Sequence, residues 1–480
     1  MPPYAAVGSL RRSNPSADSR TSAAMDIHLA LDRRAPLRAQ LEQELRAAIR
    51  SGRLRAGTKL PPSRVLADEL RVSRGVVVEA YSQLAAEGYL VARAGEGTRI
   101  AVGLAQQPPA RRAPSQVAPR IRYDLRSGVP DLSLFPRRAW QSAMTNALRE
   151  IPDAALSYGS RRGLRALRVA LSDYLARVRA VVADPERIFV TAGAAHGMLI
   201  LWQTLRQRGA KRIGVEDPAW PAIPATIAQA GLEPVPLAVD EHGLAVSELE
   251  RVDVDAVALS PAHQYPTGTV LVPGRRAELI AWARRHGTLI VEDDYDAEYR
   301  YDRDPIASLQ GLAPDCVAYV GTTSKTLAPA MRLGWVLAPS HLVGEMAAEH
   351  GVARVAPSAV SQFAYATMLE RGDIDRHLRR TRRRYHERRN ILIDGLGRDL
   401  PQASVGGAAA GLHLIAWLPE ESDEAAISDA AASRGVAIHT LHQFCAVSAQ
   451  RPPALLLGYG QIAETAIQRA VRELADAVTP

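Results

Sequence analysis

Five short apolar segments recur along the C-terminal three quarters of the chain, and each is followed by a polar or glycine-containing loop. They are Arg187–Val190, Arg212–Val215, Ala256–Leu259, Thr288–Val291 and Val317–Val320. Stretches with helical patterning lie between them. Short buried strands that alternate with helices are typical of a mainly parallel α/β sheet, which binds ligands at the carboxyl ends of its strands. The sequence therefore predicts an α/β domain whose site lies in the loops after these strands.

The positive charge of the chain is confined to its N-terminal part. A chain of 480 residues is too long for one compact core, so more than one domain is expected. Residues 1–120 hold 19 Arg and Lys against 10 Asp and Glu, whereas the remaining 360 residues hold 40 against 41. A basic first module on a neutral body indicates a polyanionic partner for that module, with nucleic acid as the leading candidate.

Several classes of protein are disfavoured by what the sequence lacks. No apolar run has the length of a membrane span, and the first residues contain no apolar core of a secretory signal. Two cysteines, Cys316 and Cys445, indicate neither a disulfide framework nor a metal-binding knuckle. We therefore expect a cytoplasmic protein without a membrane partner.

Two segments lack the apolar periodicity of folded elements. Residues 1–24 are rich in Ser, Pro, Ala and Arg and are predicted to form a disordered tail. Residues 103–122 are rich in Pro, Ala and Arg and are predicted to form a linker. These boundaries predict a first domain over residues 25–102 and a second over residues 123–480.

The first domain has the pattern of three helices followed by a hairpin. Apolar residues recur every fourth position over Leu37–Ile49 and predict the first helix. Ser63 and Ser73 are predicted to be N-caps of two further helices, over Arg64–Leu70 and up to about Glu87. Two strands joined by a glycine-rich tip are predicted to follow, Gly88–Arg93 and Thr98–Ala101. This order is typical of a winged helix-turn-helix, whose third helix enters the major groove of DNA. The alternative is a small helical module that binds another protein.

Residues 36–100 resemble the GntR family of bacterial regulators nearly throughout. The resemblance implies double-stranded operator DNA as the partner. It implies contacts to DNA phosphates and bases from four positions, Arg64, Ser73, Arg74 and Gly97. Val76 occupies a position where the family usually has Thr, and Glu79 one where Arg is frequent. Val76 cannot donate a hydrogen bond to a phosphate, so packing against a thymine methyl is its alternative role.

Lysine is rare in this chain, which makes one of its lysines informative. Only Lys59, Lys211 and Lys325 occur among 59 basic residues. Lys325 follows the fifth predicted strand, among the small hydroxyl residues of the segment VGTTSKTL. An arginine keeps its proton, whereas a lysine amine can be tuned to lose it and to form a Schiff base. The alternative is an ordinary surface lysine in a loop.

The loops after the other predicted strands also carry distinctive groups. Thr191–Gly197 opens a helix with small residues that suit a phosphate, and Trp220 suits stacking on a flat heterocycle. Residues 292–296 end a strand with carboxylates, and Arg332 follows Lys325 by seven positions. Each group alone has a structural explanation, and no histidine spacing supports a metal site at the carboxylates. Together they match the aldehyde, planar ring, pyridinium and phosphate of pyridoxal 5'-phosphate (PLP).

Residues 123–480 resemble the fold-type I aminotransferases. The segments SGVPDLSLFPRRAW, SPAHQYPTG and YVGTTSKTLAPAMRLG resemble the MocR-type regulators in particular, in which a GntR-type domain precedes an aminotransferase-like domain. This implies an N-terminal winged helix-turn-helix, then a large α/β PLP-dependent aminotransferase-like domain with a smaller α+β C-terminal unit. Lys325 would form the internal aldimine, a Schiff base with PLP. The other implied contacts are Asp293 at the pyridine nitrogen, Tyr295 at the ring hydroxyl, Trp220 on the ring, and Gly193, Ala194, Thr322, Ser324 and Arg332 at the phosphate. Tyr158 matches a tyrosine that reaches the phosphate in a partner subunit, which implies a homodimer.

Two departures from the aminotransferase pattern bear on activity. Ala195 and His196 stand where the subfamily usually has glutamines, which predicts an altered phosphate contact. Leu456 stands where aminotransferases have the arginine that binds the substrate carboxylate, and Arg451 is a nearby substitute.

Three interpretations of the whole chain stay open. It is a regulator that senses PLP or an amino compound, a working aminotransferase with a DNA-binding appendage, or a regulator whose second domain only dimerises. Lys325 argues against the third and Leu456 against the second. We therefore expect a regulator, in which a residual aminotransferase half-reaction stays open.

Overall fold

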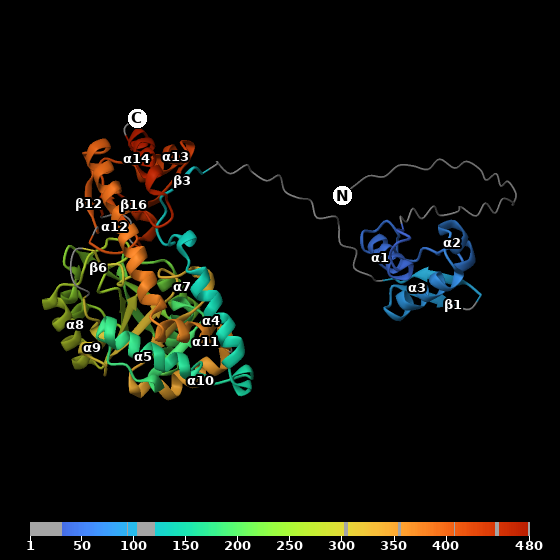
Figure 1. The fold of residues 1–480 in the computed structure, drawn as a ribbon, viewed down its shortest axis with the longest axis horizontal. Coiled ribbons are helices and arrows are strands. Elements are labelled where there is room, and N and C mark those ends of the chain that lie inside the picture. Colours follow the sequence, from blue (N-terminus) through green and yellow to red (C-terminus); the bar gives the residue numbers. More distant parts are fainter. Residues whose placement is uncertain are drawn as a thin grey trace, which may run out of the picture. The chain divides into compact units, whose positions relative to one another are not determined.

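The computed structural model describes residues 31–93, 95–102, 121–301, 306–353, 357–407, 409–446 and 451–478. The chain divides into two units, Met1–Val117 and Ala118–Pro480, which Figure 1 shows as ribbons. The predicted tail over residues 1–24 and most of the predicted linker over residues 103–122 lie outside the described residues.

The first unit consists of three helices and a two-stranded antiparallel sheet. In chain order these are α1 (Leu37–Arg50), α2 (Ser63–Leu70), α3 (Arg74–Ala86), β1 (Leu90–Arg93) and β2 (Gly97–Ile100). Leu41, Leu45 and Ile49 of the predicted apolar stripe are buried and pack in one cluster with Leu66 and Leu84 of the next two helices. The three helices and the hairpin expected from the sequence are present, and one residue of the hairpin tip, Ala94, lies outside the described part.

One of the two N-cap predictions is wrong. Ser73 does cap α3, because its hydroxyl accepts the backbone N–H of Val76 over 3.4 Å. Ser63 is instead the first residue of α2, and in the described part of the chain no side chain caps that helix. Pro62 occupies the cap position with a φ of −54°, as Pro36 does before α1 with a φ of −56°, because the proline ring fixes this angle. The proline ring thus sets the helix entry in place of a serine hydroxyl.

The second unit is built around an eight-stranded sheet in the order β4-β11-β10-β9-β8-β5-β6-β7. Its strands are β4 (Ile188–Thr191), β5 (Arg212–Asp217), β6 (Glu233–Asp240), β7 (Gly243–Leu244), β8 (Ala256–Leu259), β9 (Leu289–Asp294), β10 (Val317–Thr322) and β11 (Gly334–Leu337). The five predicted strands are all present, and no end differs from its prediction by more than three residues. Strands β10, β9, β8, β5 and β6 pair in parallel, whereas β11 runs antiparallel between β10 and β4. The mainly parallel α/β sheet is confirmed.

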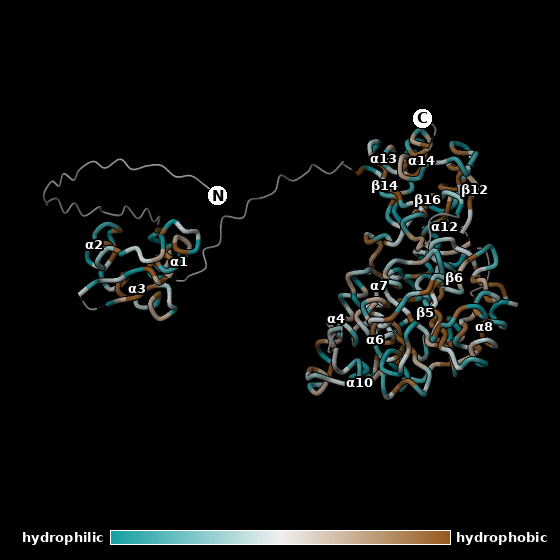
Figure 2. Tube along the Cα trace, turned by 180° about the vertical axis from the view of Figure 1, so that it is seen from behind, coloured by the Kyte–Doolittle hydropathy of each residue, from teal (hydrophilic) through white to brown (hydrophobic). Residues whose placement is uncertain are grey.

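Helices cover both faces of this sheet. Ala256 and Ala258 of β8 face a buried cluster with α6 (Ala194–Gln207) and α7 (Ala222–Gln229). Val257 and Leu259 face the opposite cluster with α8 (Pro273–His286). The residues of these two clusters come from the strands and from the helices that pack on them, and Figure 2 colours the trace of the chain by hydropathy. The helices of this layer structure are α4 (Arg137–Glu150), α5 (Arg165–Arg179), α6 (Ala194–Gln207), α7 (Ala222–Gln229), α8 (Pro273–His286), α9 (Leu309–Leu312), α10 (Val343–Ala353) and α11 (Ala359–Glu370).

A smaller α+β part completes the second unit. The 27-residue helix α12 (Asp373–Asp399) leads from the large sheet into a four-stranded sheet in the order β12-β13-β16-β15. The elements of this smaller part that follow α12 are β12 (Ser404–Gly406), β13 (His413–Trp417), α13 (Glu424–Ser433), β14 (Val436–Ala437), β15 (His439–Thr440), β16 (Ala454–Gly458) and α14 (Glu464–Val478). The short strand β3 (Tyr123–Asp124) pairs in parallel with β14, which joins the start of the unit to its C-terminal part. None of the described helices is both long and apolar enough to cross a membrane.

Candidate PLP and DNA sites

A cavity of about 620 Å³ lies at the carboxyl ends of β9 and β10 and the N-terminal end of α6. Nine of the ten residues expected to contact the cofactor line it, namely Gly193, Ala194, Trp220, Asp293, Tyr295, Thr322, Ser324, Lys325 and Arg332. The tenth, Tyr158, is fully exposed and is not among the lining residues. Parallel strands end at one edge of the sheet, so residues more than 100 positions apart converge there.

Lys325 lies in the wall of this cavity and is not an exposed loop lysine. Its Nζ donates a hydrogen bond to the carbonyl of Gly128 over 2.5 Å. Burial lowers the pKa of the Lys325 amine, and the carboxylates of Asp296 and Asp293 partly oppose that shift. A lowered pKa increases the neutral fraction of the amine, which is the form that attacks a carbonyl carbon.

Asp293 presents an unsatisfied oxygen to the cavity. Its Oδ1 is buried and has no hydrogen-bond partner among the described residues. Burial raises the pKa of this carboxyl to about 7, with a further contribution from Asp294, while Lys325 acts in the opposite direction. A buried carboxylate without a partner is costly, so a ligand that brings a cationic N–H group to Asp293 would relieve that cost.

The opposite end of the cavity suits an anion. Gly193 precedes α6 with a φ of +102°, a conformation that favours glycine, and no described side chain caps the first N–H groups of that helix. The hydroxyls of Thr322 and Ser324 lie 2.9 Å apart, and the guanidinium of Arg332 lines the same cavity. Helix N–H groups, two hydroxyls and a guanidinium are groups that bind phosphate.

His196 does not extend this anion site. Its Nδ1 accepts the backbone N–H of Ala192 over 3.1 Å. Burial, His350 and Arg332 together lower the pKa of His196 to about 4, so its ring is neutral at pH 7. The side chain is turned onto the backbone, while Ala195 lines the cavity without a polar group. Neither position therefore offers the side-chain amide that a glutamine would bring to this end of the cavity.

The structure adds residues to the site that the sequence reasoning missed. His263 Nδ1 lies 3.0 Å from the Tyr295 hydroxyl and 3.0 Å from Asp296 Oδ2, so a buried His–Asp pair stands behind Tyr295. Four further lining residues come from the start of the unit, from the loop after β8 and from the small sheet, namely Ser127, Tyr265, His439 and Phe444. His263 and Tyr265 lie in the segment SPAHQYPTG, and Ser127 opens the segment SGVPDLSLFPRRAW, both of which the sequence singled out. His439 and Phe444 belong to segments that no sequence pattern marked.

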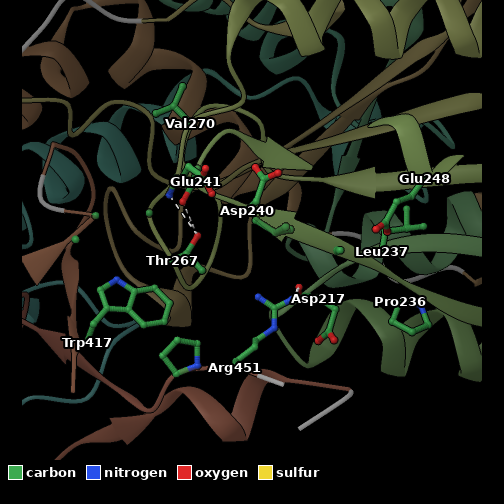
Figure 3. Close-up of a pocket in the computed structure, with 17 residues that line it drawn as sticks. Asp217, Pro236, Leu237, Asp240, Glu241, Glu248, Thr267, Val270, Trp417 and Arg451 are labelled. Carbon is green, nitrogen blue, oxygen red and sulfur yellow. Dashed lines mark hydrogen bonds between the residues drawn. The ribbon is translucent and has the colours of Figure 1, made fainter. Parts of the chain in front are cut away.

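Neither position considered for a carboxylate clamp supplies a cation to this cavity. Leu456 is fully buried in β16 and packs with Ile415 and Leu441. Arg451 lines a separate hollow of about 900 Å³, where its guanidinium donates to the backbone carbonyl of Asp217 (Figure 3). The arginine expected from aminotransferases therefore has no substitute among the residues that line the cavity.

The residues expected to contact DNA are accessible in the first unit. Arg64, Ser73, Arg74 and Gly97 are all exposed. Ser73 accepts a hydrogen bond as the cap of α3, and its own O–H can still donate to a phosphate.

Two departures in the first unit have local explanations. Val76 is partly buried and packs against the helical core, which leaves one side for a thymine methyl. Glu79 on α3 lies 3.3 Å from Arg38 of α1, so the position that is often Arg in the family carries an exposed ion pair here.

The unsatisfied Asp293 predicts how stability depends on pH. The folded pKa of about 7 lies above the ordinary value near 3.8, so the ligand-free protein should lose stability as pH rises from about 4 through 7. Asp293→Asn, which is neutral and of the same shape, should therefore stabilise the ligand-free protein at pH 8 and much less at pH 5.5. The same variant should gain little thermal stability from added PLP, whereas the wild-type protein gains several degrees. Thermal unfolding at both pH values tests this, and an Asn effect that is equal at both would contradict it.

Comparisons with known proteins give one family match for each of the two units. Residues 37–100 match the family described as bacterial regulatory proteins, gntR family, and residues 123–455 match aminotransferase class I and II. The HTH-type pyridoxine biosynthesis transcriptional regulator PdxR of Corynebacterium glutamicum is 34% identical over 95% of this chain and 99% of its own length. The probable rhizopine catabolism regulatory protein MocR of Rhizobium meliloti is 31% identical over 94% of this chain and 95% of its own. The multiple substrate aminotransferase of Thermococcus profundus matches in structure with a TM-score of 0.68 and 25% identity, covering 76% of this chain and 92% of that one.

The cavity and the comparisons together identify the cofactor. The chemistry of the lining residues fits PLP, since a lysine with a lowered pKa, a carboxyl oxygen without a partner among the described residues and groups that suit a phosphate lie around one space. The second unit is thus a PLP-binding domain of the aminotransferase class I and II type. The chain belongs to the MocR-type branch of the GntR family, the HTH-type transcriptional regulators that carry a PLP-binding aminotransferase-like domain.

Proposed function

We propose that this regulator, in the cytoplasm, holds PLP through Lys325 and changes its operator binding when the occupancy of the PLP cavity changes. The observation that carries the proposal is that nine expected cofactor contacts line the cavity, whereas its lining cations, Lys325 and Arg332, are both assigned to the cofactor. An aminotransferase that turns over amino acids also needs a cation for the substrate carboxylate, whereas a sensor needs only the cofactor groups. Several rounds of conversion of an amino acid to its keto acid would favour the catalytic alternative.

PLP supplies an aldehyde that condenses reversibly with primary amines. In our assignment Lys325 is the amine of the protein that holds it. Asp293 would accept the N–H of the pyridinium, Tyr295 would bond the ring hydroxyl, and Trp220 would stack on the ring. The phosphate would be bound by Gly193, Ala194, Thr322, Ser324 and Arg332. The buried His263 would orient Tyr295, which lies 3.0 Å from it.

The relatives support an effector that is PLP itself or an amino compound. One of them is named as a regulator of pyridoxine biosynthesis and another as a regulator of rhizopine catabolism. We infer that the effector shifts the aminotransferase-like dimer between two arrangements. Each linker would pass this change to its DNA-binding unit and alter which pair of half-sites is bridged.

DNA binding through α3 gives the first test of the proposed function. Arg74 lies in the first turn of α3, where it can reach base edges or phosphates. Arg74→Ala should weaken binding to the upstream region of the protein's own gene by about 10- to 100-fold. Arg53→Ala removes the same charge from an exposed site after α1 and should have a much smaller effect. Footprinting with and without PLP measures both, and equal losses in the two variants would contradict the assignment of α3.

We also propose that the protein is a homodimer in which Tyr158 reaches the PLP phosphate of the partner subunit. The Tyr158 side chain is fully exposed, and Leu148 and Leu156, also well exposed at 67% and 58%, lie within ten positions of it. Clustered exposed apolar side chains are typical of interaction surfaces.

The dimer proposal predicts separate effects for two substitutions. Tyr158→Phe should stay dimeric and bind PLP about 3- to 10-fold more weakly, because one hydrogen bond is lost. Leu156→Asp should weaken the dimer itself, because it would place a charge in the interface. Analytical ultracentrifugation and PLP titration distinguish the two effects, and a wild-type protein that sediments as a monomer would contradict the proposal.

A further inference from the structure

Three uncharged polar side chains form a hydrogen-bonded cluster beside Lys325 that has no role in the assignment above. The Ser127 hydroxyl lies 2.8 Å from the Tyr265 hydroxyl and 3.1 Å from Nδ1 of His439. Ser127 precedes Gly128, whose carbonyl accepts the hydrogen bond from the Lys325 amine. The cluster therefore lines the cavity next to the reactive nitrogen, where the distal part of an amine-bearing ligand would lie.

Among the described residues that line this part of the cavity, none offers a cation beyond those already assigned to PLP. Lys325, Arg332 and Asp293 are the charged side chains among the lining residues, and the proposed function assigns all three to PLP. Burial and the neighbouring Arg126 lower the pKa of His439 below its ordinary value, so its ring is neutral at pH 7. What a ligand meets beside Ser127 is thus a set of uncharged donors and acceptors.

Two arginines considered as possible partners for a ligand carboxylate, Arg126 and Arg451, bond to other groups of the protein. Arg126 makes a two-pronged ion pair with Asp124, through Nε to Oδ1 at 2.9 Å and a terminal nitrogen to Oδ2 at 2.7 Å. Arg451 faces the separate hollow of Figure 3, where it contacts Asp217. Leu456 fills its own position with a buried apolar side chain. A ligand carboxylate that entered beside Ser127 would lose its hydration without gaining an ion pair, which is costly.

A hydroxyl or amide group avoids this cost. Such a group can donate hydrogen bonds to Ser127, Tyr265 and His439 and accept hydrogen bonds from them. These bonds replace the hydrogen bonds to water that the group loses on entry. The ring of Phe444, 5.3 Å from that of Tyr265, closes the same end with an apolar edge. We propose that this end of the cavity recognises an uncharged polar group and rejects a carboxylate, so that the effector is an amino alcohol or an amino amide rather than an α-amino acid. The inference rests on the proposed function, in which the ligand amine meets PLP at Lys325.

Matched pairs of small amines test the inference on the full-length, PLP-loaded protein. Ethanolamine is compared with L-serine, and glycinamide with glycine, by titration of the visible absorbance of the bound cofactor and by thermal unfolding. In each pair the neutral compound should bind at least about 10-fold more tightly, because the carboxylate loses its hydration without compensation.

Two substitutions assign the preference to the cluster. Tyr265→Phe removes one hydroxyl from it and should reduce the preference about 3- to 10-fold. Tyr301→Phe removes a hydroxyl that bonds the Gly411 carbonyl outside the cavity and should leave the preference unchanged.

The outcomes separate this inference from the proposed function. Equal or tighter binding of the carboxylate compounds, no response to either neutral compound, or an unchanged preference in Tyr265→Phe would overturn the inference. The proposed function would survive each of these results if the wild-type protein showed the cofactor band and protected DNA. A wild-type protein without the cofactor band would overturn both.

Discussion

Lys325→Ala should abolish the visible absorbance band that PLP gives when it is bound to the wild-type protein. The band depends on a covalent bond between the cofactor and a lysine amine, and Lys325 is the lysine that lines the PLP cavity. Its amine is held over the cavity by the Gly128 carbonyl and has a lowered pKa, so it is both placed and activated for the reaction. Borohydride reduction followed by peptide mass spectrometry should place the cofactor on the peptide that contains Lys325.

The chain offers a matched control for this substitution. Lys211 belongs to the same unit and is exposed at the start of β5, so Lys211→Ala makes the same chemical change away from the cavity. It should keep the full band and the response of DNA binding to PLP. Equal absorbance in Lys325→Ala and the wild-type protein would show that the covalent assignment is wrong.

Arg179→Ala should destabilise the second unit by about 3–5 kcal/mol, the usual result of leaving one partner of a buried ion pair alone. Arg179 Nε lies 2.6 Å from Asp294 Oδ2, and the two side chains are only 2% and 3% exposed. The Tyr319 hydroxyl also donates to this carboxylate, over 2.7 Å. Without Arg179, Asp294 would be a buried carboxylate beside Asp293, whose pKa it already raises. The pair thus supports the strand that carries the PLP-facing carboxylate.

Arg177→Ala is the control, because it removes the same charge from the same turn of α5. Arg177 pairs with Asp375 over 2.8 Å, but its side chain is 57% exposed. Exposed pairs of this kind contribute about 0.2–1 kcal/mol. Urea unfolding of the ligand-free proteins compares the two variants. A loss for Arg179→Ala no larger than that for Arg177→Ala would contradict the role given to the buried pair.

Sequence patterns predicted most of the elements but missed some strands of the large sheet. The apolar segments at β4, β5, β8, β9 and β10 were predictable because continuous apolar runs indicate strands buried on both faces. β6 was missed, since Pro234 and Pro236 lie within it and proline usually opposes a strand. Among the described strands, β6 pairs along most of its length with β5 on one side, and only its last two residues pair with β7 on the other. Its two prolines lack a backbone N–H, and they are tolerated because no described strand pairs with that side of β6 at their positions. β11 is a four-residue segment that becomes a strand because β10 and β4 lie on either side of it.

The sequence by itself determined which chemical groups the protein has and which strand ends carry them. Lys325, Asp293 and Arg332 could be assigned to one ligand because parallel strands bring their carboxyl ends to one edge. Only the tertiary structure decided what surrounds these groups. Ser127 and His439 line the same cavity as Lys325, although they are 198 and 114 positions away from it in the sequence. The side chain of Arg451 lines a different hollow. The physical reason is that local periodicity encodes an element, whereas the neutral end of the cavity arises from the packing of segments that share no local pattern.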